Sequence, residues 1–586
     1  MDFQKFYAGE EFNAYTYLGA HSLDKGFVFR VYAPAARKIS LIGDFSEWDE
    51  IPMSKIYDGQ FWEVSINEAH EGQLYKYRIY KDDDSYIDHA DPYAFCSEKR
   101  PGTASIIYNV DHKFTDDKWL KDRTDNINKP LNIYEVHAGS WRRKGQWDGE
   151  SDPADGWLNY SELADELIPY LKENHYNALE MMPLADYPAD ESWGYQQTGF
   201  YSATSRYGKP EQLQDLIDRC HANGIAVILD VVTVHFAVND YALWNFDGTS
   251  LYEYPHPAVG YSEWGSCNFM HSRGDVRSFL QSSCAFWLDK YHFDGLRFDA
   301  VGNLIYWQGN SERGRNEDSI RFMQCMNKGL KRIYPNVMLI AEDSTPYIGT
   351  TESVDDGGLG FDYKWDLGWM NDTLKYFGTD YADRDKELGK ILFSMDYFNS
   401  ARYLLPLSHD EVVHGKGAII EKMNGCFEER IKQAKLLYLY MFSHPGKKLN
   451  FMGNELALTR EWDERRQLDW ESLNDKIHKE FADYCNELNR IYLENDSLWC
   501  KDYEQSGFRW LSKGHNGKAL LIYERIGTLK RTVVILNFTN REILLDAPFI
   551  ADSILLLDTL GVAGTEYGSS KPDTVKPFQG LLFEKI

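Results

Sequence analysis

Four apolar runs, each long enough for a β-strand, lead directly into an acidic residue. They are IAVILD, DGLRFD, VMLIAE and RYLLPLSHD, which end at Asp230, Asp299, Glu342 and Asp410. One such acid alone is more often a helix cap or a loop residue. Four like charges at one edge of a sheet would be costly unless a function retained them. Paired carboxylates of this kind can cleave glycosidic bonds.

Arg297 and Asp299 lie two residues apart in HFDGLRFDAV. On a strand, residues i and i+2 point to the same face, so the guanidinium and the carboxylate should project together. A nearby cation keeps a carboxylate ionised, as a nucleophile requires. The alternative is a buried structural ion pair, which would not explain the position at a strand end.

Glu342 has no cation two residues away, and its strand neighbours are Ile340 and Ala341. We therefore expect an apolar setting, which keeps a carboxyl group protonated as a general acid requires. If Asp299 and Glu342 are about 5 Å apart, the reaction retains configuration through a covalent glycosyl-enzyme.

Three further side chains follow the same strand ends. His235 lies five residues beyond Asp230, and His409 directly precedes Asp410. An imidazole can donate to and accept from sugar hydroxyls, although a structural histidine is an equally good interpretation of each. Tyr195, in ESWGYQQTGFY, is a candidate stacking surface beside the bond that is cut.

The elements that would position these residues alternate between short apolar strands and longer helical patterns from residue 131 onward. This alternation predicts a parallel sheet, and eight strands over about 350 residues predict a closed (β/α)₈ barrel. The eight predicted strands are LNIYEVHAG, NALEMMPL, IAVILDVV, DGLRFDAV, VMLIAEDS, GLGFDYKW, RYLLPLS and KKLNFMGNE.

Short strands rich in Val, Ile, Tyr and Phe precede and follow this region, and they predict a β-domain on each side. We expect a β-sandwich over residues 1–115, the barrel over 116–495 and an all-β domain, again a sandwich, over 496–586. The polar stretch 116–130 ends in Pro130 and is predicted to be a linker.

The composition excludes several classes of partner. The formal net charge of −28 opposes binding to nucleic acid and to anionic membranes, but not to a neutral sugar polymer. No apolar run is long enough to span a membrane. The N-terminus lacks a signal sequence, so we expect a cytoplasmic protein. The eight cysteines contain no CxxC pair, and neither a metal site nor a disulfide framework is predicted.

These segments resemble a known family. HFDGLRFDAV, GIAVILDVVTVHF, LIAEDST and LPLSHDEVVHGKG are similar, in order, to the four signature regions of the α-amylase superfamily, glycoside hydrolase family 13. YEVHAGSWRR, ESWGYQQTGFY and HPGKKLNFMGNELALTREWDERRQLDW narrow the resemblance to the 1,4-α-glucan (glycogen) branching enzymes. FRVYAPAARKISLIGDFSEWD resembles the glucan-binding sandwich that precedes the barrel in these enzymes.

The resemblance implies a role for each candidate residue. Asp299 matches the nucleophile, Glu342 the acid/base and Asp410 the third carboxylate, which holds sugar hydroxyls. Arg297 matches the arginine that supports the nucleophile. The residues that match binders of the reacting ring are Tyr195, Asp230, His235 and His409.

The implied activity is transfer of an α-1,4-glucan chain (glycogen, amylose or amylopectin) to a 6-hydroxyl, in glycogen biosynthesis and without a cofactor. The alternatives are an amylase-type or debranching hydrolase on the same scaffold, and a glucan-binding protein without catalysis. The oligomeric state is open, with a monomer expected.

The chain departs from the family at three places. VVTV stands between Asp230 and His235 where a proline is common, the loop after Asp299 is short, and KGAIIEKMNGC is unusual. These departures concern branch length and acceptor preference rather than the catalytic acids.

Overall fold

The computed structural model describes residues 1–586 except 146, 148, 516, 546–547, 551 and 562–571. The chain forms two compact units. The first comprises Met1–Thr124, Arg142–Asp165 and Met181–Phe361, and the second comprises Asp125–Trp141, Glu166–Glu180 and Asp362–Ile586. No helix in the described part of the chain is long and apolar enough to cross a membrane.

The eight predicted strands form a closed barrel in the order of the sequence, and the predicted (β/α)₈ fold is confirmed. Their pairing is parallel wherever the register is defined, as expected for strands joined by helical crossovers. The strands are β10 (Asn132–Val136), β11 (Ala178–Met181), β14 (Ala226–Val231), β17 (Gly295–Phe298), β18 (Met338–Ala341), β19 (Tyr363–Trp365), β20 (Tyr403–Leu407) and β21 (Lys447–Phe451).

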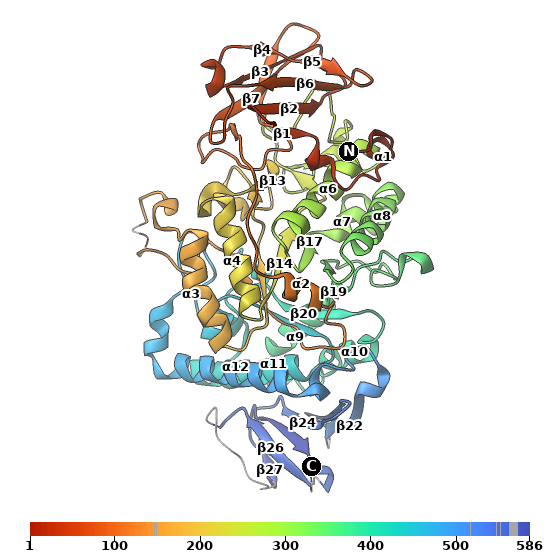
Figure 1. The fold of residues 1–586 in the computed structure, drawn as a ribbon. Coiled ribbons are helices and arrows are strands. Elements are labelled where there is room, and N and C mark those ends of the chain that lie inside the picture. The colour runs from red at the N-terminus through yellow and green to blue at the C-terminus, as the bar shows by residue number, and fades with distance from the viewer. Residues whose placement is uncertain (146, 148, 516, 546–547, 551, 562–571) are drawn as a thin grey trace. The chain divides into compact units, whose positions relative to one another are not determined.

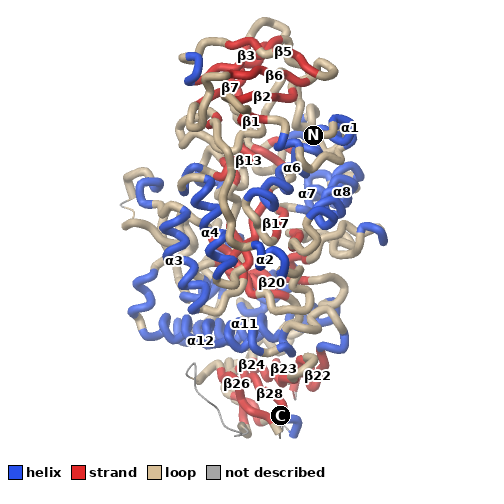
Figure 2. Tube along the Cα trace, viewed as in Figure 1, coloured by secondary structure: helices blue, strands red, loops and turns tan. Residues whose placement is uncertain are grey.

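Helices occupy the segments between these strands, as Figure 2 shows. α8 illustrates the local signals: Asn316 caps its first turn, Glu317 and Asp318 follow, and Lys331 and Arg332 lie in its last turn, so the charges complement the helix dipole. The helices of six or more residues that follow β10 and precede β22 are α3 (Tyr160–Glu173), α4 (Pro210–Ala222), α6 (Gly274–Lys290), α8 (Glu317–Ile333), α9 (Leu367–Phe377), α10 (Gly389–Tyr397), α11 (Phe427–Ser443) and α12 (Lys476–Glu494).

The first unit begins with the predicted β-sandwich (Figure 1). In β7, Tyr75, Tyr77 and Ile79 are buried while the intervening residues are partly exposed, which is the two-residue period of a strand with one covered face. One sheet has the order β1 (Gly19–Ser22), β2 (Phe27–Tyr32), β6 (Phe61–Ile66), β5 (Ser54–Ile56), and the other β4 (Ile51–Pro52), β3 (Lys38–Gly43), β7 (Leu74–Tyr80), β8 (Tyr86–His89), with β9 (Ser105–Ile106) paired to β7.

The N-terminal helix α1 (Phe3–Ala8) packs against α6. The Ser278 hydroxyl donates to the Phe6 carbonyl at 2.9 Å, and the Gln281 side chain donates to the Gly9 carbonyl at 3.0 Å. A Cβ atom at Gly274, the first residue of α6, would lie 1.8 Å from the Tyr7 carbonyl oxygen. Only glycine allows this close approach, so Gly274 lets the N-terminal segment pack directly on the first turn of α6.

The polar stretch predicted to be a linker is ordered structure. It contains α2 (Asp117–Asp122), and Asp116 is buried. The Asp116 carboxylate contacts Nδ1 of His221 at 2.8 Å and Nδ1 of His292 at 2.9 Å. The linker prediction is therefore wrong, because a polar composition does not reveal partners that lie far away in the sequence.

The second unit ends in the predicted all-β domain. Leu520, Ile522, Val533 and Phe583 belong to one buried apolar cluster. Residues from both sheets of this domain contribute to the cluster. A five-stranded sheet has the order β22 (Phe508–His515), β23 (Lys518–Ile526), β24 (Arg531–Asn537), β28 (Gly580–Lys585), β26 (Ser553–Asp558), and β25 (Ile543–Leu544) pairs with β27 (Thr574–Val575).

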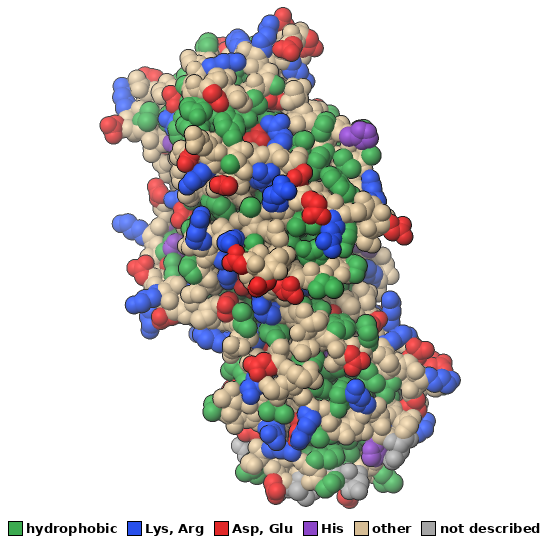
Figure 3. Space-filling model, turned by 90° about the vertical axis from the view of Figure 1, so that its right-hand side faces the viewer, with side chains coloured by type: hydrophobic (Ala, Val, Ile, Leu, Met, Phe, Trp, Pro, Cys, Tyr) green, Lys and Arg blue, Asp and Glu red, His purple; other side chains and the backbone are tan. Residues whose placement is uncertain are grey.

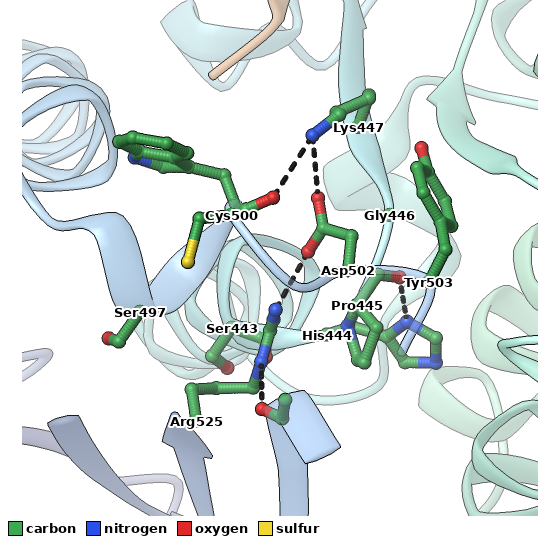
Figure 4. A network of polar contacts seen from close by, with 12 residues as sticks. Ser443, His444, Pro445, Gly446, Lys447, Ser497, Cys500, Asp502, Tyr503 and Arg525 are labelled. Atoms are coloured by element: carbon green, nitrogen blue, oxygen red, sulfur yellow. Dashed lines mark hydrogen bonds and ion pairs between the residues drawn. The ribbon is translucent and has the colours of Figure 1, made fainter. Parts of the chain in front are cut away.

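A buried ionic network joins this domain to the barrel strand β21 (Figure 4). The Asp502 carboxylate accepts from Nζ of Lys447 at 3.0 Å and from Nη2 of Arg525 at 2.7 Å. All three side chains are completely buried. Nζ of Lys447 also donates to the carbonyls of Lys129 and Trp499. One carboxylate thus compensates two cations from β21 and β23.

Candidate active site

Three neighbouring strands of the first unit carry four of the candidate residues. In the parallel register, Asp230 of β14 lies beside Arg297 of β17, which lies beside Ile340 of β18. The backbone pairing continues past the strand ends, since Asp299 N–H donates to Val231 O at 3.1 Å and Glu342 N–H donates to Phe298 O at 3.0 Å. Asp299 and Glu342 are therefore at the carboxyl ends of adjacent strands, where catalytic residues of such barrels lie.

Arg297 connects these acids. Its side chain is fully buried, and its Nη1 atom lies 2.5 Å from Oδ2 of Asp230 and 3.1 Å from Oδ1 of Asp299. Its Nη2 atom lies 2.9 Å from Oε2 of Glu342. Burial alone would lower the pKa of Arg297, but attraction to Asp230 and the other anions holds this pKa well above its ordinary value. The cation is permanent, and the predicted pairing of Arg297 with Asp299 is confirmed.

The expectation of an apolar setting for Glu342 is wrong. It considered only residues along the same strand, whereas the Arg297 guanidinium reaches Glu342 from the adjacent strand. The planar fork of arginine can serve two acceptors at once, so one residue contacts both proposed catalytic acids. Both acids contact one guanidinium, which favours a short distance between the two carboxyl groups, as in retaining enzymes. Inverting enzymes have a longer distance, which leaves room for a water molecule.

The residue after Asp299 also contacts Glu342. Ala300 adopts a left-handed backbone conformation with φ of 48°, which is uncommon for a residue other than glycine. This conformation precedes α7 (Val301–Ile305) and directs the Ala300 N–H to Oε2 of Glu342 at 2.8 Å. Both donors to Glu342 therefore bind Oε2, and a proton on this carboxyl group belongs on Oε1.

Asp230 is the buried acid of the cluster, and the partly exposed Tyr195 lies against it. The Tyr195 hydroxyl donates to Oδ2 of Asp230 at 2.6 Å and lies 3.3 Å from Nη1 of Arg297. The side chain of Asp230 is 1% exposed, whereas those of Asp299 and Glu342 are 15% and 19% exposed. The two proposed catalytic acids are thus the more exposed carboxylates of this cluster.

His235 lies outside this network, in β15 (His235–Phe236). Burial lowers its pKa to about 4, so the imidazole is neutral near pH 7. Its Nδ1 atom is buried and has no hydrogen-bond partner among the residues that the structure describes. An unsatisfied buried ring nitrogen of this kind is unusual and can accept from or donate to a hydroxyl group that comes within reach.

His409 and Asp410 belong to the second unit, directly after β20 and Ser408. The buried His409 is held by Glu135: its Nδ1 lies 2.5 Å from Oε1, and its backbone N–H donates to Oε2 at 3.0 Å. Its Nε2 atom lies 3.5 Å from Oδ1 of Asp410, whose side chain is 45% exposed. Glu135 fixes the orientation of the imidazole, so that His409 presents Nε2 to Asp410.

Sequence reasoning missed Glu135. Its signal was available, since YEVHAG is the first predicted barrel strand and Glu135 is a charged residue within an apolar run. No group of three or more His, Cys, Asp or Glu side chains in the described part of the chain is arranged to hold a metal ion.

Two stretches match known protein families. Residues 17–94 match Carbohydrate-binding module 48 (Isoamylase N-terminal domain), and residues 163–247 match the catalytic domain of alpha amylase.

Curated relatives match along most of the chain. The 1,4-alpha-glucan branching enzyme GlgB of Fusobacterium nucleatum is 45% identical over 556 residues, which cover 92% of this chain and 88% of that protein. The enzymes of the same name from Halothermothrix orenii and Bacillus caldolyticus are 42% and 39% identical, covering 91% and 98% of this chain and 87% and 88% of theirs.

Solved structures share the fold at low sequence identity. A putative alpha amylase from Salmonella typhimurium aligns with a TM-score of 0.73 and 17% identity over 97% of this chain and 100% of that chain. A pullulanase from Bacillus acidopullulyticus aligns with a TM-score of 0.74 and 18% identity over 99% of this chain and 76% of that chain.

Proposed function

We propose a function that proceeds from one fact: this chain belongs to the family of 1,4-α-glucan branching enzymes. It cuts an α-1,4-linked glucan and transfers the released chain to a 6-hydroxyl, which forms an α-1,6 branch. Its similarity to relatives of that name along nearly the whole chain carries this proposal. The acids that Arg297 joins at the ends of β17 and β18 support the chemistry.

In the first step Asp299 acts as the nucleophile. Arg297 stabilises its ionised form and orients Oδ1 at 3.1 Å. A carboxylate oxygen of Asp299 forms a bond to the anomeric carbon while the bond from that carbon to the 4-oxygen of the next glucose breaks. Glu342 donates its proton to the departing 4-oxygen, and a covalent glycosyl-enzyme results.

In the second step Glu342 acts as the base. It takes the proton from the 6-hydroxyl of an acceptor glucan, whose oxygen attacks the anomeric carbon and releases Asp299. Two inversions give net retention. Arg297 suits both steps, because the charge that Asp299 loses on forming the ester appears on Glu342, which contacts the same guanidinium.

The other candidate residues bind the reacting ring. We assign this role to Tyr195, Asp230, His235 and His409, and we assign to Asp410 the holding of sugar hydroxyls as the third carboxylate. The Nδ1 of His235, which has no hydrogen-bond partner in the described part of the chain, and the exposed carboxylate of Asp410 support this assignment.

The substrate is a neutral α-glucan such as glycogen, amylose or amylopectin. Charged side chains of both signs are interspersed on the face that Figure 3 shows, and a neutral polymer meets no long-range repulsion from the net charge of −28. Residues 17–94, which match a carbohydrate-binding module, support a second point of attachment on the sandwich. We propose a monomer with domain limits at 1–115, 116–495 and 496–586.

The test is incubation with amylose, followed by iodine staining and by counting reducing ends before and after isoamylase treatment. Branching lowers the staining, creates few reducing ends before isoamylase and releases many after it. Many new reducing ends without isoamylase would show a hydrolase instead, and no change at all would show a glucan-binding protein.

Replacing the nucleophile tests the mechanism. Asp299→Asn should lower the branching rate by roughly 1,000-fold or more, because a neutral amide cannot form the glycosyl ester. Asp82→Asn, a surface substitution in the same unit, is the matched control and should leave the rate unchanged. Undiminished activity of Asp299→Asn would show that another group is the nucleophile.

A further inference from the structure

The chain between His235 and Asn268 leaves the barrel end and returns to it. β15 pairs antiparallel with β16 (Cys267–Asn268), so that His235 lies beside Asn268 and Phe236 beside Cys267. The residues just before Cys267 are therefore brought back to the neighbourhood of His235, which we have assigned to the reacting ring.

A tight turn at the end of this excursion fixes the backbone of Trp264. Ser262 N–H donates to Ser266 O at 2.8 Å, and the two serine hydroxyls lie 2.6 Å apart. Trp264 N–H donates to the Ser262 hydroxyl at 3.2 Å. Gly265 supplies the left-handed residue of the turn with φ of 75°. Trp264 lies at the tip of this hydrogen-bonded turn.

Two contacts connect Trp264 to the candidate active site. Its ring lies 5.2 Å from the His235 ring, and its carbonyl accepts a hydrogen bond of 3.0 Å from Nε2 of Gln196. Gln196 directly follows Tyr195, whose hydroxyl binds Asp230. The Trp264 backbone is thus tied to the loop that positions Tyr195, and its side chain flanks His235.

The Trp264 side chain nevertheless remains 45% exposed. Among the described residues, its ring contact is with His235. An indole on a hydrogen-bonded backbone, half exposed and beside a buried imidazole, offers a flat apolar face to a ligand, and an aromatic side chain has few rotatable bonds to fix on binding.

We propose that Trp264 is a stacking platform for the glucose unit next to the one that reacts at His235. The sugar lies with its apolar face on the indole, and its hydroxyls remain free to bind polar groups. This inference rests on the proposed function, and it adds a specificity-determining residue outside the network that Arg297 organises. Because the platform holds one unit of a chain, it contributes to affinity for the polymer and to the choice of the bond that is cut.

Binding is measured in an Asp299→Asn background, so that no turnover occurs. Titration calorimetry with maltoheptaose should show Kd roughly 10-fold higher when Trp264→Ala is added, and a change of less than about 3-fold for Trp264→Phe, which keeps an aromatic face. Phe393→Ala in α10 removes another exposed aromatic ring, 58% exposed, and should leave Kd unchanged.

Activity gives a second measurement. In the active enzyme Trp264→Ala should raise KM for amylose more than it lowers kcat, and it should broaden the distribution of transferred chain lengths. Equal Kd values for the Asp299→Asn protein with and without Trp264→Ala would overturn the proposal. If Trp264→Ala does not fold, as judged by circular dichroism, Trp264→Gln and Trp264→Phe are compared instead, and equal affinity overturns it in the same way. The unaltered enzyme could fail to form isoamylase-sensitive linkages while maltoheptaose binding still depends on Trp264. That result would refute the proposed function but would still support Trp264 as a stacking platform.

Discussion

Arg297 is one guanidinium with three anionic partners. Asp230, Asp299 and Glu342 contact it at 2.5, 3.1 and 2.9 Å, and it has no exposed surface. One buried positive charge therefore faces three carboxyl groups and is the cation that contacts each of them. Positioning and charge compensation at this site therefore depend on a single side chain.

Arg297→Lys tests this dependence. Lysine keeps the charge but presents it at one point, so it cannot contact Asp299 and Glu342 through separate nitrogens. We expect kcat/KM for amylose to fall by about 100-fold, with a native circular dichroism spectrum. Arg321→Lys in α8, whose side chain is 66% exposed, is the control and should behave as the unaltered enzyme. Full activity of Arg297→Lys would show that charge alone suffices.

Some of the residue contacts in the site could be predicted from the sequence. The i, i+2 spacing on a strand brings Arg297 and Asp299 together in any register, so their pairing could be predicted. The contact between Arg297 and Glu342 could not, because it depends on the register between β17 and β18. The contact between Glu135 and His409 was missed for a similar reason, since Glu135 lies on β10 and His409 follows β20.

Among the elements, α4 is tied to the N-terminal end of β17 by a buried histidine. His221 of α4 contacts Asp116 at 2.8 Å and Asp294 at 2.9 Å, and the Trp119 indole N–H also donates to Asp294. Burial lowers the pKa of His221, but attraction to Asp294 and the hydrogen bonds to both acids outweigh it and raise this pKa to about 9. His221 is a cation near pH 7.

This cation makes stability depend on pH. The pKa of His221 is higher in the folded chain than the value of about 6.5 expected after unfolding, so its contribution is complete below pH 6.5 and is lost as pH rises through about 9. His221→Gln should reduce the decline in Tm between pH 6.5 and 9, as measured by differential scanning fluorimetry. Other groups face the same site, namely Asp116, Asp294, His292, Arg123 and Cys220.

The exposed His70 provides the control for this experiment. His70→Gln should leave the dependence of Tm on pH as it is in the unaltered protein. The same steep decline in His221→Gln would show that another group is responsible. Sequence reasoning could not foresee this contact, because it treated Asp116 as part of a polar linker and had no means of pairing it with His221.

Over the whole molecule, all eight barrel strands could be predicted, because each is a short apolar run bounded by polar residues and followed by a helical pattern. The β-rich regions before and after the barrel were predicted in the same way, from strands with a two-residue period. The burial of charged residues such as Lys447 could not be predicted in this way. KKLNF reads as a strand that begins in solvent, yet Lys447 and Lys448 are completely buried.

Asp502→Asn tests what these charges contribute. It would leave Lys447 and Arg525 buried beside a neutral amide, and breaking a buried pair in this way costs about 3–5 kcal/mol. We expect Tm to fall by at least about 5 °C. Asp483→Asn removes the partner of Lys479 on an exposed face of α12, where ion pairs contribute little, and should leave Tm unchanged. Equal Tm values for the two variants would show that the Asp502 network contributes nothing to stability.

The Lys447–Asp502–Arg525 network also bears on how the chain is made. During synthesis the last barrel strand leaves the ribosome before Asp502 and Arg525 do. Until then the Lys447 ammonium lacks the carboxylate that compensates it in the native state, and the strand is poorly suited to burial. The order of synthesis thus implies that β21 gains its native surroundings only after the segment that carries Asp502 has been made, and that the network is complete only when Arg525 of β23 follows.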